Sequence, residues 1–221
     1  MAGSTWWTLT HAQAAIEALA TVAFGLSGLI EAARKRLDAV GVCVVAGLAA
    51  FGGGTLRDVL LDRRPFFWVQ HAWWLWVLLA LCIAAMLTMR ARHFEPTERA
   101  MQWPDALGLG LFTASGTQIA LDAGMPAIVA VLMGMVSAVF GGVLRDVVCN
   151  QIPSAFSDHR PYAVCSFAGG WVLVGAQALG ASPGVALAAG AMTAMLARVA
   201  ALVTGWNLPA WAVADEPRRR R

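Results

Sequence analysis

Two copies of one charged motif stand inside long apolar segments. Residues 53–59 read GGTLRDV and residues 141–147 read GGVLRDV, 88 positions further along the chain. Arginine and aspartate are costly in lipid surroundings, and ionisable residues there usually mark the pathway of an ion or substrate. The glycines give the backbone freedom to depart from a regular helix. This pattern therefore predicts ion or solute transport beside two broken helices, rather than bond-making chemistry.

The composition is that of a membrane protein. Hydrophobic residues make up 59% of the 221 residues and charged residues only 13%, against roughly 25% charged in an average soluble domain. The mean hydropathy is +0.65. We expect a single membrane domain over residues 1–221, with the lipid bilayer and not nucleic acid as its surroundings. The first apolar stretch is too long for a signal-peptide core, so no cleavage is expected.

A hydrocarbon core about 30 Å thick requires about 20 helical residues, and this length divides the chain into seven predicted spans. They cover residues 12–32, 38–61, 69–90, 104–122, 125–148, 161–180 and 184–206. Most Lys and Arg lie after spans one, three and five and in the basic tail, 207–221, whereas the opposite side carries only Arg63 and Arg64. The positive-inside rule then predicts an inner (plasma) membrane protein with its N-terminus outside and its C-terminus cytoplasmic. The tail is expected to fix this topology, with binding to anionic lipid as the alternative.

Shifting the sequence by 88 residues extends the match beyond the motif. Residues that recur include Phe24 as Phe112, Ser27 as Ser115 and Pro65 as Pro153. Spans one to three (12–90) therefore repeat as spans four to six (104–180), and span seven (184–206) has no counterpart. Because three is odd, the second copy is expected to enter the membrane from the other face, as in the inverted repeats of transport proteins. The alternative is a duplicated helical bundle with no path through it.

The glycines of spans two and five are expected to break their helices near the membrane midplane. Breaks would free backbone carbonyls near residues 48–51 and 137–140, and such oxygens can ligate a partly dehydrated cation. The alternative interpretation of each glycine group is close helix packing. The predicted break residues are Gly52, Gly53, Gly54, Gly141 and Gly142.

Six charged residues are assigned to the two mouths of the pathway. From the helical rise, Arg57 lies roughly 10 Å to one side of the midplane and Arg145 as far to the other side. Neighbours on a helix point about 100° apart, so neither arginine is expected to pair with the aspartate that follows it. We predict instead the pairs Glu17 with Arg57 and Asp105 with Arg145, leaving Asp58 and Asp146 free to face water or cations. The alternative is that all six side chains reach separately to the interfaces.

The remaining candidates are polar and aromatic side chains. Polar lining is expected from Ser27, Ser115, Thr117 and Ser137, although such hydroxyls often bond only their own backbone. Phe24 and Phe112 could form a hydrophobic gate or could equally face lipid. Arg198 is expected to reach out of span seven toward the interface. The histidines and cysteines lack the spacing of a metal site, and no nucleotide loop or nucleophile-and-base set is present, so we expect no cofactor and no enzyme.

Residues 51–68, FGGGTLRDVLLDRRPFFW, together with residues 140–153, FGGVLRDVVCNQIP, resemble the bacterial branch of the trimeric intracellular cation channel (TRIC) family, which is also labelled as a glycine transporter domain family. The resemblance implies a homotrimer with one pore per subunit around the kinked second and fifth spans. It implies conduction of potassium and other monovalent cations, with potassium in transit as the only metal. Animal members carry a lysine-containing, lipid-binding motif after the fifth-span glycines, but this chain reads VLRDV there, so phosphoinositide regulation is not carried over.

Two functions from different classes thus remain open from the residues. The first is a passive channel for monovalent cations. The second is a secondary transporter of glycine or another small zwitterion, because inverted repeats with discontinuous helices are typical of carriers and half-helix N-termini suit a substrate carboxylate. The resemblance favours the channel.

Overall fold

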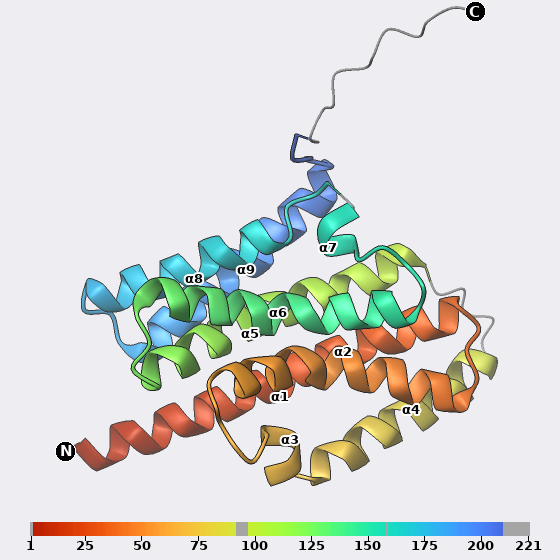
Figure 1. The fold of residues 1–221 in the computed structure, drawn as a ribbon, viewed down its shortest axis with the longest axis horizontal. Helices are drawn as coiled ribbons and strands as arrows, with labels where there is room; N and C mark the ends of the chain where they lie inside the picture. Colours follow the sequence, from red (N-terminus) through yellow and green to blue (C-terminus); the bar gives the residue numbers. More distant parts are fainter. Residues whose placement is uncertain (1, 92–96, 158, 210–221) are drawn as a thin grey trace, which may run out of the picture.

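The computed structural model describes residues 2–91, 97–157 and 159–209, with side chains from residue 13 onward except at 89–91. Within these ranges the chain is all helical (Figure 1). The tail from residue 210 lies outside the described residues, so its predicted role stays a prediction. The helices are α1 (Ala2–Arg34), α2 (Ala39–Leu60), α3 (Phe67–Gln70), α4 (Trp73–Ala91), α5 (Glu98–Asp122), α6 (Ala127–Val148), α7 (Ser154–Ser157), α8 (Ala163–Ala178) and α9 (Pro183–Thr204).

The long helices overlap the segments predicted from hydropathy, although α1 and α5 begin ten and six residues before their predicted starts. The two short helices, α3 and α7, precede α4 and α8. Residues Gln13–Arg34 of α1 and the whole of α2, α6 and α9 are long and apolar enough to cross a membrane, while α4 and α8 contain shorter apolar stretches. Helix α5 carries more charge and packs against α1, α6, α8 and α9. Protein neighbours rather than lipid therefore surround much of α5, which explains its lower hydropathy.

The 88-residue repeat recurs in the backbone. Arg36 and Gly124, which are related by the shift, both adopt left-handed torsions, with φ of 53° and 76°. Asp62 and Asn150 do the same after α2 and α6, with φ of 51° and 55°. The chain therefore ends the related helices with the same local geometry, as expected when each copy folds by the same rules.

Helices α2 and α6 cross in opposite directions at their glycines, and both run through them without interruption. A Cβ placed on Gly53 would lie 2.0 Å from the Ser137 carbonyl oxygen, and one on Gly141 would lie 2.4 Å from the Ala49 carbonyl oxygen. Because Ala49 and Ser137 are themselves 88 residues apart, the same close contact is made twice. The glycines thus allow two backbones to touch, as small residues do in membrane helix pairs.

The described conformation therefore shows no interruption of these helices at the glycines, and the expected kinks stay a prediction. Both helices continue past Gly52, Gly53, Gly54, Gly141 and Gly142. The carbonyls of Ala49 and Ser137, which were expected to be free for a cation, instead face the glycines of the opposite helix. Close packing is the physical reason for the glycines here, and a bare Cα facing a carbonyl also permits weak C–H···O contacts.

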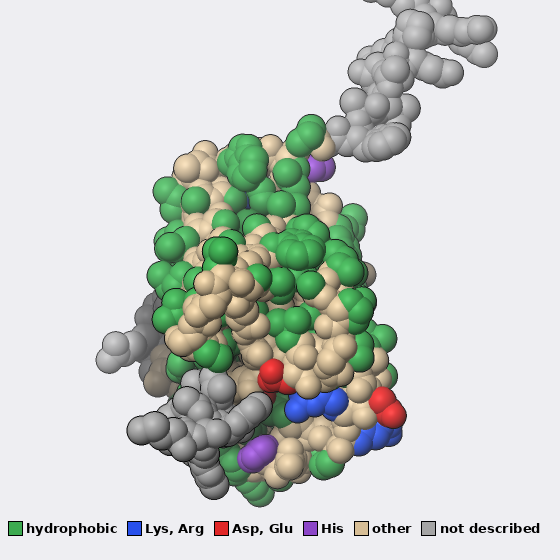
Figure 2. Space-filling view, turned by 90° about the vertical axis from the view of Figure 1, so that its left-hand side faces the viewer, with side chains coloured by type: hydrophobic (Ala, Val, Ile, Leu, Met, Phe, Trp, Pro, Cys, Tyr) green, Lys and Arg blue, Asp and Glu red, His purple; other side chains and the backbone are tan. Residues whose placement is uncertain are grey.

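Hydrophobic side chains form the core and much of the surface. One buried cluster joins α1, α2 and α4, a second lies around α1, α5 and α6, and a third joins α5, α8 and α9. Viewed from the left-hand end of Figure 1, the surface is mainly hydrophobic or uncharged, and acidic and basic side chains gather in the lower part of the view (Figure 2). The apolar surface and the apolar helices fit a multi-pass membrane protein.

Candidate functional site

The first charged cluster is built on the last turns of α2 and the first half of α1. The Arg57 side chain is buried, and its Nη1 donates to Glu17 Oε1 at 2.8 Å. This confirms the predicted pair. On its other edge Arg57 Nε donates to Asp58 Oδ1 at 2.9 Å, and Nη2 lies 2.8 Å from the same oxygen. Arg63 follows the helix, with its Nη1 3.7 Å from Asp58 Oδ1.

The second charged cluster lies at the corresponding position of α6 and α5. Arg145 Nη1 donates to Asp105 Oδ1 at 2.6 Å and to the Ser27 hydroxyl, and Nε donates to Asp146 Oδ1 at 2.8 Å. The predicted pair of Asp105 with Arg145 is confirmed. Asp105 Oδ2 accepts a further hydrogen bond from the Tyr162 hydroxyl at 2.7 Å. All five of these residues are buried, at 0 to 3% exposure.

The expectation that Asp58 and Asp146 are free to face water is wrong. Both carboxylates are buried and bonded to the arginine directly before them. Asp146 Oδ2 also accepts from the Ser154 backbone N–H at 2.8 Å and from the Ser154 hydroxyl at 3.0 Å. The 100° offset between neighbours excludes contact only for short side chains, whereas the long arginine side chain can fold back along its own helix.

Each arginine therefore lies between two carboxylates, and the core of each cluster carries a formal charge of −1. The alternative in which the six charges reach separately to the interfaces is excluded by these contacts. Buried ions require partners because desolvation costs several kcal/mol per ion. At the second cluster the additional carboxylate exceeds what neutrality requires and favours a nearby cation over an anion. At the first cluster Arg63 lies beside Asp58, and the cavity is lined by three acidic and three basic residues, so the charges there balance.

A polar cavity opens at each charged cluster. The first, of about 260 Å³, is lined by Glu17, Arg57 and Asp58 together with the loop that follows α2. The second, of about 430 Å³, is lined by Arg34, Glu98, Asp146 and the loop that follows α6. Because α2 and α6 run in opposite directions, the two cavities lie toward opposite ends of this helix pair. The repeat therefore places a polar cavity toward each end of this helix pair.

Phe24 and Phe112 lie between the two clusters along α1 and α5. Their rings stack with centroids 5.6 Å apart, and both side chains are buried. The alternative in which they face lipid is therefore wrong. Since the two residues are related by the 88-residue shift, a residue of the first copy packs against its own counterpart in the second. The role of this ring pair as a gate stays a prediction.

The four predicted lining hydroxyls are all buried but differ in their partners. Ser27 belongs to the second cluster, where it also donates to Asp105 Oδ1 at 3.3 Å. Ser137 donates to the Met133 carbonyl of its own helix at 2.8 Å, as isolated serines in helices often do. Ser115 and Thr117 have no hydrogen-bond partner for their hydroxyl oxygens among the described residues. These two side chains retain the capacity to hydrate or ligate a passing cation.

Several functional side chains were missed from the sequence. Tyr162 is the only tyrosine of the chain and holds Asp105 in place. Arg198, which was expected to reach toward the interface, is buried; its Nη1 donates to the Pro161 carbonyl at 3.1 Å, and its guanidinium lies 4.7 Å from the Tyr162 ring centroid. The prediction that Arg198 reaches the interface is wrong, because the Pro161 carbonyl and the Tyr162 ring take the place of water around its guanidinium. A lone tyrosine near a span end was the one available signal.

Glu31 is a further buried carboxylate that the repeat did not indicate, because its counterpart is Ile119. Its Oε2 accepts from Arg34 Nη1 at 2.5 Å, while Oε1 has no partner among the described residues. Burial, followed by the charge of Glu31, raises the pKa of the nearby Cys149 thiol. That thiol is therefore kept neutral at ordinary pH. Across the described residues, no group of three or more His, Cys, Asp or Glu is arranged to hold a metal ion.

Comparison with known families finds the repeat independently. The sequence model of the family described as "Glycine transporter" matches this chain twice, over residues 14–90 and over residues 102–178. The two matched ranges are again offset by 88 residues and together cover most of the chain. Each matched range contains one arginine–aspartate motif and its paired carboxylate.

Similar proteins occur in bacteria. A UPF0126 membrane protein of Vibrio cholerae is 34% identical over 202 residues, covering 90% of this chain and 82% of the relative. The UPF0126 inner membrane protein YadS of Escherichia coli is 32% identical over 208 residues, covering 92% of this chain and 98% of YadS.

Two solved structures share the fold. The TRIC trimeric intracellular cation channel orthologue from Rhodobacter sphaeroides superposes with a TM-score of 0.82 at 31% identity, covering 88% of this chain and 98% of the other. A second structure, described in terms of conductance through TRIC cation channels, superposes with a TM-score of 0.79 at 28% identity, covering 91% of this chain and 98% of the other.

Proposed function

This chain belongs to the bacterial TRIC family, whose sequence model carries the description of a glycine transporter, and we propose that it is a monovalent cation channel. The observation that carries the proposal is the pair of polar cavities at opposite ends of α2 and α6, each beside an arginine held between two carboxylates. Related structures named as cation channels support it.

The excess carboxylate of the second cluster favours cations at that entrance, whereas the first cavity supplies carboxylates that its arginines balance. One net negative charge attracts a monovalent cation 4 Å away by roughly 4 kcal/mol at an effective dielectric constant of about 20. This attraction raises the local cation concentration without requiring a tight site, as conduction demands. The arginines position the carboxylates, and the excess carboxylate charge selects the sign of the ion.

The proposed path runs from the first cavity past the ring pair of Phe24 and Phe112 to the second cavity. The carbonyls near Ala49 and Ser137 do not form its ion site in the described conformation, because they face the glycines of the crossing. Ser115 and Thr117 are better candidates to replace water around the ion, since their buried hydroxyl oxygens have no partner among the described residues. The stacked rings would act as a hydrophobic barrier that opens when they separate.

Several finer features belong to the same proposal. We propose that the duplicated helices form an inverted repeat in the membrane, with α9 as the additional span, an outside N-terminus and a cytoplasmic C-terminus. We further propose a homotrimer with one pore per subunit and potassium as the main ion. The name of the related Rhodobacter protein supports the trimer, and the distribution of Lys and Arg supports the orientation.

A secondary transporter of glycine or another small zwitterion is the competing function, and the family description supports it. Carriers of this kind hold a substrate carboxylate at half-helix N-termini that point into the membrane. Helices α2 and α6 are continuous here and present no such termini. The continuous helices therefore favour the channel.

Purified full-length protein in a planar bilayer separates the two functions. A channel predicts discrete unitary currents in potassium chloride solutions. A carrier predicts electrically silent bilayers together with saturable glycine counterflow in proteoliposomes. Glycine counterflow without unitary currents would overturn the proposed function.

A further inference from the structure

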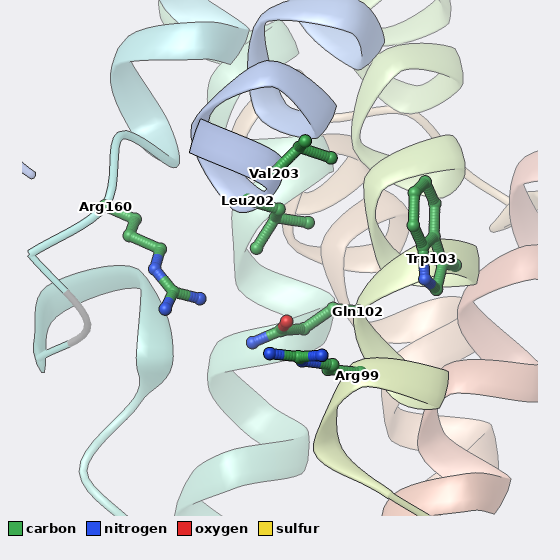
Figure 3. Close-up of a pocket in the computed structure, with 6 residues that line it drawn as sticks. All are labelled: Arg99, Gln102, Trp103, Arg160, Leu202 and Val203. Atoms are coloured by element: carbon green, nitrogen blue, oxygen red, sulfur yellow. The ribbon is translucent and has the colours of Figure 1, made fainter. Parts of the chain in front are cut away.

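A third cavity, of about 290 Å³, lies apart from the two charged clusters (Figure 3). It is formed by the first turns of α5, the last turns of α9 and the segment before α8. Figure 3 shows the guanidinium groups of Arg99 and Arg160 extending toward the same space beside the Gln102 amide. The lining residues are Arg99, Gln102, Trp103, Arg160, Leu202 and Val203.

The polar part of this cavity suits a phosphate group. None of its six lining residues is acidic, and two of them are arginines. A guanidinium presents its N–H groups as a planar fork that matches two phosphate oxygens. Arg160 also interacts within the protein, so the Arg99 fork and the remaining N–H groups of Arg160 would share one phosphodiester. Gln102 is 9% exposed, forms part of the cavity wall and donates from its Nε2 to Glu98 Oε1 at 3.3 Å, so the arginines provide the main contacts for a phosphate. Binding pockets for whole drug-sized ligands occupy about 300 to 1,000 Å³, so this cavity fits a headgroup rather than a complete large ligand.

The apolar part of the cavity suits the glycerol and acyl portion of a lipid. Leu202 and Val203 border the arginines on the α9 side, and the Trp103 ring lies across from them (Figure 3). Trp103 is 54% exposed, and Trp206, just beyond the end of α9, is 60% exposed. Half-exposed indoles at helix ends are typical of the boundary between headgroups and acyl chains. The cavity is therefore charged on one side and apolar on the other.

The cavity also lies outside the duplicated pattern. Arg99 and Arg160 correspond in the repeat to His11 and Ala72, and α9 has no counterpart at all. Only one end of the molecule therefore carries two arginines at this place. The bias of Lys and Arg assigns that end to the cytoplasmic side, where basic pockets between membrane helices bind anionic headgroups.

We propose that this cavity binds the phosphodiester headgroup of an anionic phospholipid. The site is one helical turn from the second charged cluster, because Gln102 precedes Asp105 by three residues on α5. Arg160 precedes Tyr162, which donates to Asp105, by two residues. A bound headgroup joins the start of α5 to the segment before α8 and holds together the two elements that position Asp105.

Lipid binding is measured without ion conduction, so the proposal can fail or succeed independently of the proposed function. The full-length protein in detergent is titrated with phosphatidylglycerol or phosphatidylcholine, and the retained lipid and the thermal midpoint are recorded. Glycerol phosphate and inorganic phosphate at equal concentration form separate arms. We expect phosphatidylglycerol to be retained and to raise the midpoint, phosphatidylcholine to do neither, and the free phosphates to act only at much higher concentration.

Matched variants locate the site. The double change Arg99→Gln with Arg160→Gln is expected to weaken phosphatidylglycerol retention by about tenfold or more, since bonds to charged groups are lost. The control Lys35→Gln with Arg36→Gln removes two exposed charges from the same predicted side and leaves the cavity intact. It is expected to retain lipid as the unmodified protein does.

Three results would overturn the proposal. The first is equal retention of phosphatidylglycerol and phosphatidylcholine by the unmodified protein, a measurement that requires no variant. The second is an equal loss of retention in the control pair, which would show a diffuse charge effect. The third is binding of the free phosphates as tight as that of the lipid, which would assign the cavity to a soluble anion.

Discussion

The two charged clusters are related by the repeat but are not equivalent in energy, and this difference is testable by removing one charge from each. Asp105→Asn and Glu17→Gln are the matched changes, because each replaces a carboxylate by its amide of nearly equal shape. The Glu17 side chain is 17% exposed and bonds only Arg57 in its cluster, whereas the Asp105 side chain is 4% exposed. Asp105 also accepts from Arg145, Ser27 and Tyr162.

The magnitude follows from these contacts. An amide at position 105 has one oxygen for the donors Arg145 and Tyr162, and its NH₂ group must face the other donor. Breaking a buried ion pair from one side costs about 3–5 kcal/mol; since Asp146 still neutralises Arg145, we expect about 3 kcal/mol. At position 17, water reaches the group and Arg57 keeps Asp58, so we expect about 1 kcal/mol.

Tryptophan fluorescence during heating measures the difference, because the chain contains 10 Trp residues. For a protein of this length, 1 kcal/mol corresponds to about 2–4 °C, so Asp105→Asn should lower the apparent midpoint by about 6–12 °C and Glu17→Gln by about 2–4 °C. Both variants are heated at one scan rate in one detergent, because membrane proteins commonly unfold irreversibly. Equal shifts, or a larger shift for Glu17→Gln, would refute the assignment of Asp105 as the more deeply paired carboxylate.

Three further changes test separate parts of the structure. Gly53→Ala places a Cβ 2.0 Å from the Ser137 carbonyl oxygen and should lower the thermal midpoint. In the control Gly175→Ala the new Cβ has no atom within 4 Å, so the midpoint should be unchanged or slightly raised. Equal midpoints for the two variants would disprove the tight crossing. Phe112→Ala removes a buried stacked ring, which should cost about 3–5 kcal/mol and increase cation leak in proteoliposomes, and an unchanged leak would exclude the gate. Tyr162→Phe deletes one hydrogen bond to a charged acceptor and should cost about 1.5–3 kcal/mol in a chemical unfolding measurement; no loss would show that this contact does not hold the second cluster.

The repeat and the two ion pairs could be predicted from the sequence because both rest on simple geometry. An 88-residue shift aligns Glu17 with Asp105 and Arg57 with Arg145, and the helical rise then brings each pair to the same depth. The structure confirms both pairs. Helix positions were equally accessible, since a membrane span imposes a length that hydropathy can measure.

Other features depended on information that the sequence does not contain. Glycines such as Gly53 permit either a helix break or a close helix crossing. Which of the two forms depends on the helix packed against the glycine, here at the Ser137 carbonyl. Whether Arg57 folds back onto Asp58 depends on a side-chain conformation, which the helical wheel does not fix. The cavity between Arg99 and Arg160 requires α5, α9 and the segment before α8 to meet, and only the tertiary structure brings them together.

The central claim is that the buried carboxylates of the two clusters make the pathway selective for cations. The most direct measurement is the reversal potential of the purified protein in a planar bilayer under a tenfold potassium chloride gradient. A pathway that passes only cations reverses at about 60 mV in the direction set by potassium. The structure predicts a value close to this limit for the unmodified protein and a clear shift toward zero for Asp58→Asn combined with Asp146→Asn. A reversal potential near zero, or of the sign set by chloride, in the unmodified protein would contradict the claim.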